Sequence, residues 1–355
     1  MNLQPFLFPE AVDVPECWTP RDVEQVRSLC APWQLVVDSV TLKAVTEAVW
    51  HLDRVLNHSA HRDKARQRQG LAGLPMEQEG GFLCYDFHIQ NGVPKLVEVN
   101  SNAGGWLICA WLAGCSMEDW IIPMVRGSWS QLRPGQPLEQ VWLVDEHPQQ
   151  QFLYPEFKLF QALFERAGLR SLICDIQAVH SLEPQPGVLL YNRLTDFYLH
   201  KYPELNRWPL LPSPSTYAVY ADKRNLMDLA ADPKLSQWIL PVYPVASQSF
   251  DYWWSTRAQW FFKPVAGYGS KAVYRGARIS RGILNELCQR DDYIAQQFCP
   301  AGTLVTPEGQ PFKYDLRVYS WAAKPALISA RLYQGQVTNL RTPGGGFSVV
   351  QAMKG

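Results

Sequence analysis

The sequence lacks the features that mark several large classes of protein. Its 33 Lys and Arg residues balance its 33 Asp and Glu residues, so it has no overall basic field that would gather a nucleic acid backbone. Its longest apolar run, Trp106 to Cys115, falls well short of the ~18 residues that a membrane-spanning helix needs. We therefore expect neither nucleic acid nor a membrane as the main partner.

The spacing of the cysteines and the lack of early positive charge exclude two further kinds of sequence signal. The 8 cysteines form no Cys-x-x-Cys pair, so the common zinc and redox spacings are missing. The first basic residue is Arg21, so no positively charged segment precedes an apolar one, as a secretory signal requires. We expect reduced thiols and a cytoplasmic protein.

The composition is that of a folded protein with more than one domain. The chain has 355 residues, of which 47% are hydrophobic and 19% are charged. At about 150 residues per domain, this length has room for two or three domains. Shifts in composition and period divide it into segments 1–130, 139–215, 216–300 and 301–355, with a Pro- and Gly-containing linker at residues 130–139. The oligomeric state stays open.

The first segment contains an amphipathic helix and a hairpin. Apolar residues recur at three/four spacing through residues 42–56, which predicts a helix. The polar stretch 58–68 reads as a solvated helix end and loop, since its histidines match no metal-binding spacing. Residues 82–100 read as two strands around Asn91-Gly92, the strongest short hairpin signal. An apolar helix is expected after Gly105.

Residues 139–215 alternate strand, helix and strand, which indicates an open-sheet α/β module. Its Asn192-Arg193 pair follows a predicted strand at 188–191, and such sheets place ligands at the carboxyl ends of their strands. Later elements are expected as helices at 223–231 and 280–289 and as strands at 260–262, 272–274, 293–298, 315–321 and 326–332.

A glycine-rich loop follows the predicted strand at 260–262. Gly267-Tyr-Gly-Ser-Lys271 can present consecutive backbone N–H groups to phosphate oxygens, with Lys263 just ahead as a cation for the same phosphates. The loop is not a P-loop, because the second glycine of that motif falls on Ala272. It matches the looser dinucleotide fingerprint, although a strand rather than a helix is expected to follow. A surface lysine beside a plain turn is the alternative.

Asp86, Glu98 and Asn100 lie on the two strands of the predicted hairpin. Carboxylate and amide oxygens are hard ligands of the kind that Mg²⁺ takes together with substrate phosphates. A two-residue loop at Asn91-Gly92 would put Asp86 and Glu98 on opposite faces of the sheet. We therefore predict a three-residue loop, Asn91 to Val93, which places Asp86 opposite Glu98 and points both toward Lys263.

Cations concentrate near the C-terminal end of the sequence. Lys313, Arg317 and Arg331 occupy predicted strands together with Asp315, and Asn339 and Arg341 follow. Arginine binds phosphate through two parallel hydrogen bonds and keeps its proton, which suits it to a transferring phosphoryl group. Cross-strand salt bridges are the alternative for each of them.

Taken together, these pieces resemble the ATP-grasp superfamily of carboxylate ligases. The resemblance rests on Asp222-Lys223, Phe262-Lys263-Pro264 with the 267–271 loop, the hinge 293–298, Asp315-Leu-Arg317, Ala330 to Tyr333, the segment 339–346, and Asp86 with Glu98-Val-Asn100. The hairpin precedes the other motifs here, whereas in the common arrangement it comes last. This order resembles a circularly permuted ATP-grasp fold with a preceding open-sheet module, as in glutathionylspermidine synthetase, and it leaves residues 1–37 unexplained.

The resemblance implies an enzyme: an ATP-dependent ligase that forms a C–N bond through an acylphosphate, from a small carboxylate substrate and an amine, less often a thiol. It implies ATP bound by Lys223, Lys263, Gly267, Gly269, Ser270, Lys271, Gln296, Gln297, Phe298 and Cys299. It implies one or two Mg²⁺, or Mn²⁺, on Asp86, Glu98 and Asn100. Catalytic roles fall to Arg317, Arg331 and Asn339, and substrate contacts to Asn192, Arg193, Arg341, Gly344, Gly345 and Gly346. Gln297 stands where the family hinge usually carries an acid. A kinase-like phosphotransferase and a non-catalytic nucleotide-binding scaffold remain as alternatives.

Overall fold

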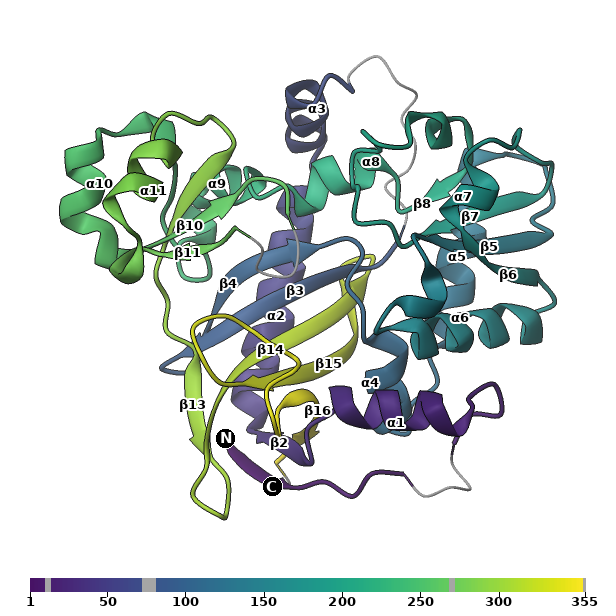
Figure 1. Cartoon of the computed structure of the whole chain (residues 1–355), viewed down its shortest axis with the longest axis horizontal. Coiled ribbons are helices and arrows are strands. Elements are labelled where there is room, and N and C mark those ends of the chain that lie inside the picture. The colour runs from purple at the N-terminus through teal and green to yellow at the C-terminus, as the bar shows by residue number, and fades with distance from the viewer. Residues whose placement is uncertain (10–13, 72–80, 268–271, 354–355) are drawn as a thin grey trace.

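The computed structural model describes residues 1–9, 14–71, 81–267 and 272–353, and these form a mixed α/β fold with three sheets (Figure 1). The strands are β1 Asn2–Pro5, β2 Trp33–Val37, β3 Leu83–Gln90, β4 Val93–Asn100, β5 Gln140–Asp145, β6 Arg170–Asp175, β7 Val188–Asn192, β8 Leu210–Leu211, β9 Val242–Pro244, β10 Trp260–Pro264, β11 Tyr274–Arg275, β12 Tyr293–Gln297, β13 Gly302–Val305, β14 Pro311–Trp321, β15 Lys324–Tyr333 and β16 Gly346–Ala352. The helices are α1 Pro20–Leu29, α2 Ser39–Leu56, α3 Ser59–Arg68, α4 Trp106–Leu112, α5 Glu118–Leu132, α6 Tyr154–Arg166, α7 Ile176–Val179, α8 Pro214–Thr216, α9 Asn225–Ala230, α10 Phe250–Thr256 and α11 Arg281–Leu287.

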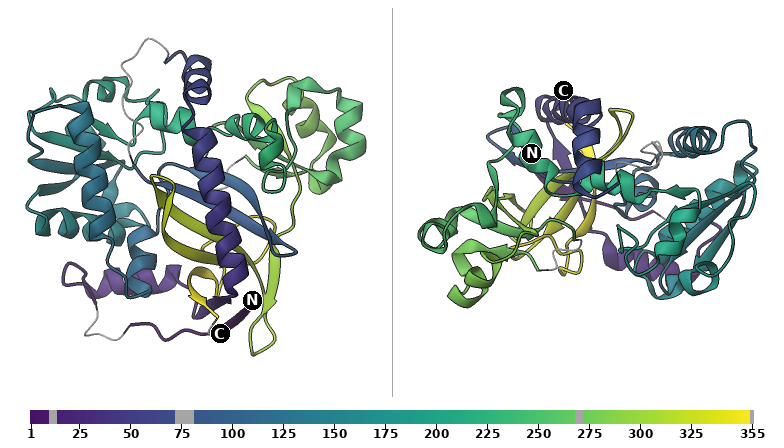
Figure 2. Two further views of the ribbon diagram at one scale, coloured as in Figure 1. Left: turned by 180° about the vertical axis from the view of Figure 1, so that it is seen from behind. Right: turned by 90° about the horizontal axis from the view of Figure 1, so that it is seen from above.

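The central sheet runs in the order β1-β2-β16-β15-β14-β3-β4, and β13 pairs with β14. Helix α2 crosses one face of it (Figure 2). Asp38 caps this helix by accepting the N–H of Thr41 at 2.8 Å, and the three/four spacing then buries Val49 and Leu52 against the sheet. The predicted helix at 42–56 is confirmed, one turn longer at its start.

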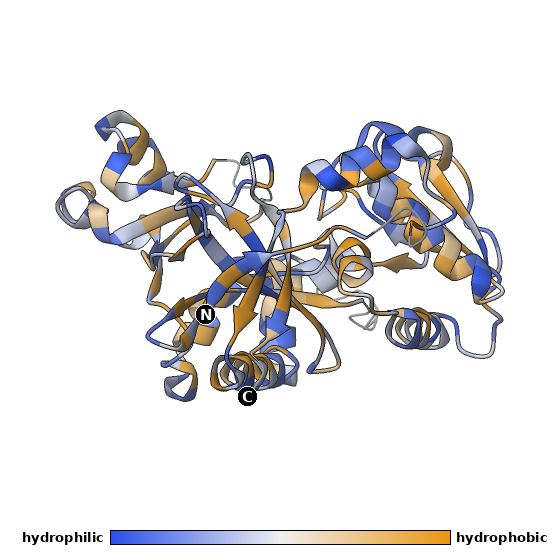
Figure 3. Ribbon diagram, turned by 90° about the horizontal axis from the view of Figure 1, so that it is seen from below, coloured by the Kyte–Doolittle hydropathy of each residue, from blue (hydrophilic) through white to orange (hydrophobic). Residues whose placement is uncertain are grey.

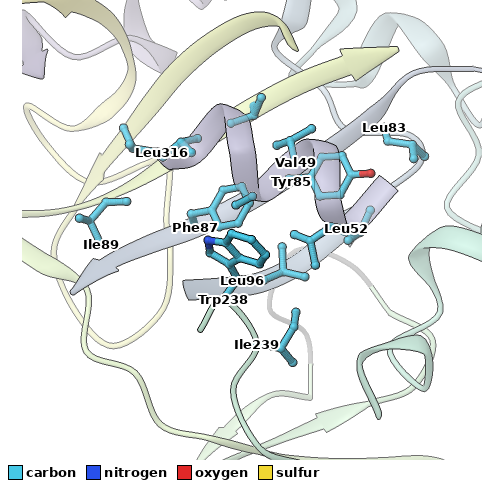
Figure 4. Close-up of a cluster of buried hydrophobic side chains, with 14 of the residues drawn as sticks. Val49, Leu52, Leu83, Tyr85, Phe87, Ile89, Leu96, Trp238, Ile239 and Leu316 are labelled. Atoms are coloured by element: carbon cyan, nitrogen blue, oxygen red, sulfur yellow. The ribbon is translucent and has the colours of Figure 1, made fainter. Parts of the chain in front are cut away.

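Strand alternation separates an apolar face from an ionic one. Tyr85, Phe87 and Leu316 point toward α2 in the cluster drawn in Figure 4. Successive side chains of a strand point to opposite faces, so Asp86 and Arg317 lie on the face away from α2. Coloured by hydropathy, the strands of the interior are rich in hydrophobic residues, and the outer helices mix hydrophobic and hydrophilic positions (Figure 3).

The register of the β3–β4 hairpin arises in a different way from our prediction. Asp86 opposes Glu98 as expected, but the turn is the two-residue Asn91-Gly92, with φ of 51° and 80°. The odd residue sits in a β-bulge, where Val97 is skipped between the pairs Phe87–Leu96 and Asp86–Glu98. The three-residue loop was therefore wrong, and a bulge supplies the shift that we had assigned to the turn.

Two smaller sheets flank the central one, one on each side (Figures 1 and 2). The parallel sheet β6-β5-β7-β8 confirms the open-sheet pattern, with α5 and α6 on one face and α7 on the other. The antiparallel sheet β11-β10-β12-β9 buries Phe262 and Ala295 against α10 and α11. Alternation along β10 turns the neighbouring Lys263 away from these helices.

Several elements were not foreseen. The polar stretch at 58–68 forms α3, and the expected linker at 130–139 begins inside α5. Residues before 38 form β1, α1 and β2, of which β2 pairs parallel with β16. All eight cysteines are free thiols. Among the described residues, no helix combines the length and apolar character needed to cross a bilayer. The domain limits and the circular permutation stay predictions.

Candidate functional site

A row of paired charges crosses the face of the central sheet that is turned away from α2. Asp86 is fully buried and holds Arg317 in a bidentate pair, with Nε to Oδ1 and Nη2 to Oδ2 both at 2.8 Å. Arg331 reaches the same Oδ2 at 2.9 Å and pairs with Asp315 at 2.8 and 2.9 Å. Asp315 also accepts the hydroxyl of Thr338 at 2.8 Å.

Electrostatics keeps this row ionised. Burial alone would raise the pKa of Asp86, but Arg317 and Arg331 outweigh it and hold that pKa below its ordinary value. Burial opposes the charge of both guanidinium groups as well, yet the facing carboxylates raise the pKa of Arg317 and of Arg331. The row is thus a fixed set of charges at neutral pH.

Glu98 and Asn100 extend the row onto β4. Asn100 Nδ2 donates to Asp86 Oδ2 at 3.2 Å and to Glu98 Oε1 at 3.5 Å, which brings the three predicted metal ligands together. Glu98 Oε2 lies 3.7 Å from Lys223 Nζ. Burial raises the pKa of Glu98, but the cations Lys223, Lys263 and Arg331 together outweigh it, and the net shift is downward.

Lys263 approaches Glu98 from β10, in the sheet β11-β10-β12-β9. Its ammonium donates to Gln296 Oε1 at 2.6 Å and to the carbonyl of Val97 at 3.3 Å, and Gln296 in turn donates to the carbonyl of Leu96 at 3.2 Å. The carbonyls of the bulged Val97 and of its neighbour Leu96 on the edge strand β4 are thus bound by residues of β10 and β12. Burial lowers the pKa of Lys263 to about 8, despite the facing carboxylate of Glu98.

Gly267 is held from both sides where the glycine-rich loop begins. Lys223 Nζ donates to its carbonyl at 3.0 Å, and its N–H donates to the hydroxyl of Tyr217 at 3.3 Å. Tyr217 opens η4 Tyr217–Ala221, a π-helical turn of the kind that is frequent at functional sites. Gly269, Ser270 and Lys271 lie outside the described residues.

The remaining hinge residues lie along the end of β12. Gln297 is exposed, so its side chain does not face the buried site as Gln296 does. Phe298 packs on Phe261 and under the guanidinium of Arg275, whose Cζ lies 4.5 Å from the ring centroid. The carbonyl of Cys299 lies 2.8 Å from His88 Nδ1, which links this hinge to the hairpin.

Asn192 and Arg193 stand at the junction of the parallel sheet with the central sheet. The Asn192 amide nitrogen donates to the carbonyl of Pro212, which follows β8, and its side-chain oxygen accepts the N–H of Leu194. These bonds give the side chain a part in the local structure. Arg193 Nη1 donates to Asn102 at 2.6 Å, and Nη2 lies 3.9 Å from the buried Glu156. Its Nε is buried without a partner.

The C-terminal segment does not join the ionic row through its predicted residues. Asn339 is exposed, and its side chain accepts the N–H of Arg341, which is also exposed. A Cβ at Gly345 would lie 2.4 Å from the Leu332 carbonyl, and one at Gly346 would lie 2.2 Å from that of Leu29. These two glycines are therefore required by close backbone contact, whereas Gly344 is exposed. Their substrate roles stay predictions.

Charge and donor chemistry show which expected groups fit. Four cations, Lys223, Lys263, Arg317 and Arg331, face three carboxylates, so the site has a positive excess that suits a polyphosphate. Glu98 and Asn100 present oxygens that fit Mg²⁺. Asp86 fits less well, because Arg317, Arg331 and Asn100 already donate to it. No cluster of three or more His, Cys, Asp and Glu suited to a metal occurs within the described ranges.

Sequence reasoning missed several residues that shape this site. Glu156 on α6 accepts the N–H groups of Gly105 and Leu107 at the start of α4 at 2.9 and 3.0 Å, and an ordinary helical glutamate carries no signal of that contact. Tyr217 and Asn102 were missed for the same reason. Gly104 was not among the predicted site residues, although its carbonyl accepts from Arg317 at 3.3 Å and from Tyr319 at 3.0 Å.

Comparison with known proteins gives a match at the level of structure. No protein-family model matches the sequence. No curated protein matches it either. The chain is similar to a glutathione synthetase-like effector from Globodera pallida in its apo form, with a TM-score of 0.60, 10% identity, and coverage of 96% of this chain and 99% of that one.

Two further solved structures are more distant. A provisionally named gamma-glutamylcysteine synthetase from Methylobacillus flagellatus has a TM-score of 0.47 and 10% identity, over 87% of this chain and 86% of that one. A D-cycloserine synthetase has a TM-score of 0.36 and 17% identity, over 59% of this chain and 71% of that one. The first likeness spans nearly the whole of both chains, and it shows that this chain shares the fold of that glutathione synthetase-like effector.

Proposed function

We propose that the chain is an ATP- and Mg²⁺-dependent ligase that joins a small amino-acid or peptide-like carboxylate to an amine. The observation that carries this proposal is the convergence of Lys223, Lys263, Arg317 and Arg331 on Glu98 and Asp86 at one sheet face. Charge neutralisation and positioning are the main tasks of a protein that transfers a phosphoryl group. The relationship in fold to a glutathione synthetase-like effector is consistent with this assignment.

The proposed reaction has two steps. A carboxylate oxygen of the acid attacks the γ-phosphorus of ATP, the bond from that phosphorus to the β–γ bridging oxygen breaks, and ADP leaves. The amine then attacks the acyl carbon of the acylphosphate, the C–O bond to phosphate breaks, and the nitrogen gives up one proton as the amide forms. ADP, inorganic phosphate and an amide are the products.

The side chains divide these tasks. Lys223 and Lys263 would bind phosphate oxygens, and Gln296 fixes the Lys263 ammonium. Arg317 and Arg331, held by Asp86, would neutralise the phosphoryl group as it moves. Glu98 and Asn100 are the residues that would hold Mg²⁺, which would supply further positive charge for the phosphate groups. Arg193 stands at the carboxyl edge of the parallel sheet, where the second substrate would enter.

The experiment is a metabolite screen with product identification. The full chain is incubated with ATP, Mg²⁺, and pools of amino acids or short peptides with amines, while ADP and phosphate release are followed and new masses are identified. A ligase releases both and forms a product lighter by one water than its two substrates. ADP without free phosphate, with a phosphorylated product, would replace the ligase by a phosphotransferase.

A scaffold protein would release no ADP with any pool, and this result would overturn the enzyme proposal. Lys263→Met should abolish the release, because it removes a buried ammonium from the site. Lys324→Met serves as the matched control, since Lys324 is an exposed lysine at the start of β15.

A further inference from the structure

The two ends of the described chain enclose a cavity of about 480 Å³. One wall comes from the first 32 residues, including Phe6, Phe8, Arg27 and Ser28, and the other comes from the segment that holds Arg341 and Gly344. None of Lys223, Lys263, Glu98 or Gln296 lines it, so it is separate from the proposed nucleotide site. This volume falls within the range of small-molecule pockets.

Two arginines at this cavity have no acidic partner. Neither Arg27 nor Arg341 forms an ion pair with a carboxylate in the part of the chain that the structure describes, and both are exposed. The guanidinium carbon of Arg27 lies 5.0 Å from the centroid of the Phe8 ring, so that ring orients the cation rather than neutralising it. The cavity therefore combines two guanidinium groups, unpaired with any carboxylate of the described residues, with aromatic surface.

The cavity lies beside the strand that borders the ionic row. Phe347 on β16 pairs with Arg331 on one side, and on the other side it bridges Cys30, which lines the cavity. The N–H of Ala31, another lining residue, donates to the Phe347 carbonyl at 2.8 Å. The cavity thus lies next to β16, the strand that pairs with the strand of Arg331.

We propose that this cavity binds a small organic anion, with its carboxylate or phosphate between Arg27 and Arg341 and its apolar part against Phe6 and Phe8. Guanidinium groups keep their charge and match both anions geometrically. Phenylalanine rings favour a flat or apolar portion. The proposal gives residues 1–37 a binding function, for which the family resemblance offers none, and it does not depend on the proposed ligase activity.

Matched probes test the proposal by ligand-observed NMR and calorimetry on the full chain without ATP. The probes are 3-phenylpropionate, its uncharged amide 3-phenylpropionamide, and phenyl phosphate. We expect the amide to bind at least tenfold more weakly than the better of the two anions. The stronger of these anions identifies the group that the cavity prefers.

Variants locate the binding. Arg27→Gln and Arg341→Gln should each weaken binding of the preferred anion about tenfold, and the double variant should abolish it. Arg21→Gln is the control, because Arg21 is an exposed arginine of the same helix that does not line the cavity. Circular dichroism checks that each variant is folded.

Three outcomes would overturn the inference: no binding of either anion, equal binding of the amide and the better of the two anions, or unchanged affinity in the folded double variant. Because no nucleotide is present, these outcomes are independent of whether the chain turns out to be a ligase.

Discussion

At the scale of single residues, burial of an ammonium group is the most consequential feature of the candidate site. Lys263 is 7% exposed, and burial lowers its pKa to about 8. The ammonium is therefore charged at pH 7 and becomes neutral as the pH rises through 8. A lysine whose proton comes off this close to neutrality makes phosphate binding sensitive to pH.

We expect the affinity for ATP to be highest below pH 8 and to fall by up to about tenfold per pH unit above it, because only the charged form of Lys263 attracts phosphate. Calorimetry between pH 7 and 9.5 measures this. Lys263→Met should bind weakly at every pH and show no change near 8. A wild-type affinity that stays level across this range would remove Lys263 from the phosphate site.

We expect Arg317, a proposed catalytic residue, to have a structural role as well. Arg317→Ala leaves the buried Asp86 with Arg331 as its one remaining guanidinium partner among the described residues. We expect a loss of about 3 kcal/mol in the free energy of unfolding, since breaking a buried ion pair leaves a charge poorly compensated. Urea unfolding measures it, and Arg290→Ala, which breaks an exposed pair with Asp292, should change almost nothing.

At the scale of elements, the register of the β3–β4 hairpin is shifted by one residue through a bulge rather than through its turn. The tight Asn91-Gly92 turn and the Asp86–Glu98 pair are incompatible in a regular ladder. They coexist because Val97 bulges out. The carbonyls of Leu96 and Val97, at the bulge, accept from Gln296 and Lys263.

Deleting Val97 should therefore give a regular ladder in which Asp86 still opposes Glu98, while Lys263 loses its carbonyl partner. We expect a folded protein, shown by an unchanged circular dichroism spectrum, with ATP affinity reduced several-fold in calorimetry. Val97→Ala keeps the backbone carbonyl and should bind ATP normally. Full affinity in the deletion variant would mean that ATP binding does not depend on the bulge.

At the scale of the whole molecule, the buried carboxylate of Glu156 connects a helix that packs on the parallel sheet with a helix that packs on the central sheet. Glu156 on α6 caps the start of α4 by accepting two backbone N–H groups, and Arg193 lies beside it. Burial raises the pKa of Glu156, and the nearby Arg193 opposes this shift. Because Gly104, next to this cap, also contacts Arg317, the junction connects the parallel sheet to the ionic row.

Glu156→Ala should lower the free energy of unfolding by at least about 2 kcal/mol, because two buried N–H donors lose their acceptor. Urea unfolding followed by tryptophan fluorescence measures the change. Glu183→Ala is the control, since Glu183 is 78% exposed and pairs with Arg207 at the surface. Equal stability of the Glu156 variant and the wild type would show that water satisfies this junction.

The sequence by itself determined what depends on neighbours along the chain. The spacing of Val45, Val49 and Leu52 predicts α2, Asn91-Gly92 predicts the position of the hairpin though not the length that we assigned to its turn, and alternation along 82–100 predicts an ionic face opposite an apolar one. The α/β character of residues 139–215 followed from the same local signals, whereas the expected fold family rested on a resemblance. These held because periodicity, capping and turn chemistry act over a few residues.

Tertiary structure decided the contacts between residues far apart in the chain. Lys263 meets the Val97 carbonyl, Glu156 meets Gly105, and Arg27 shares a cavity with Arg341, and no local pattern specifies any of these pairs. The bulge at Val97 belongs with them. It allows the two-residue turn and the Asp86–Glu98 pair to coexist, and its carbonyl also accepts from Lys263. Such contacts depend on how the sheets pack together, and a pattern with a period of two or 3.6 residues carries no information about which sheet will lie opposite.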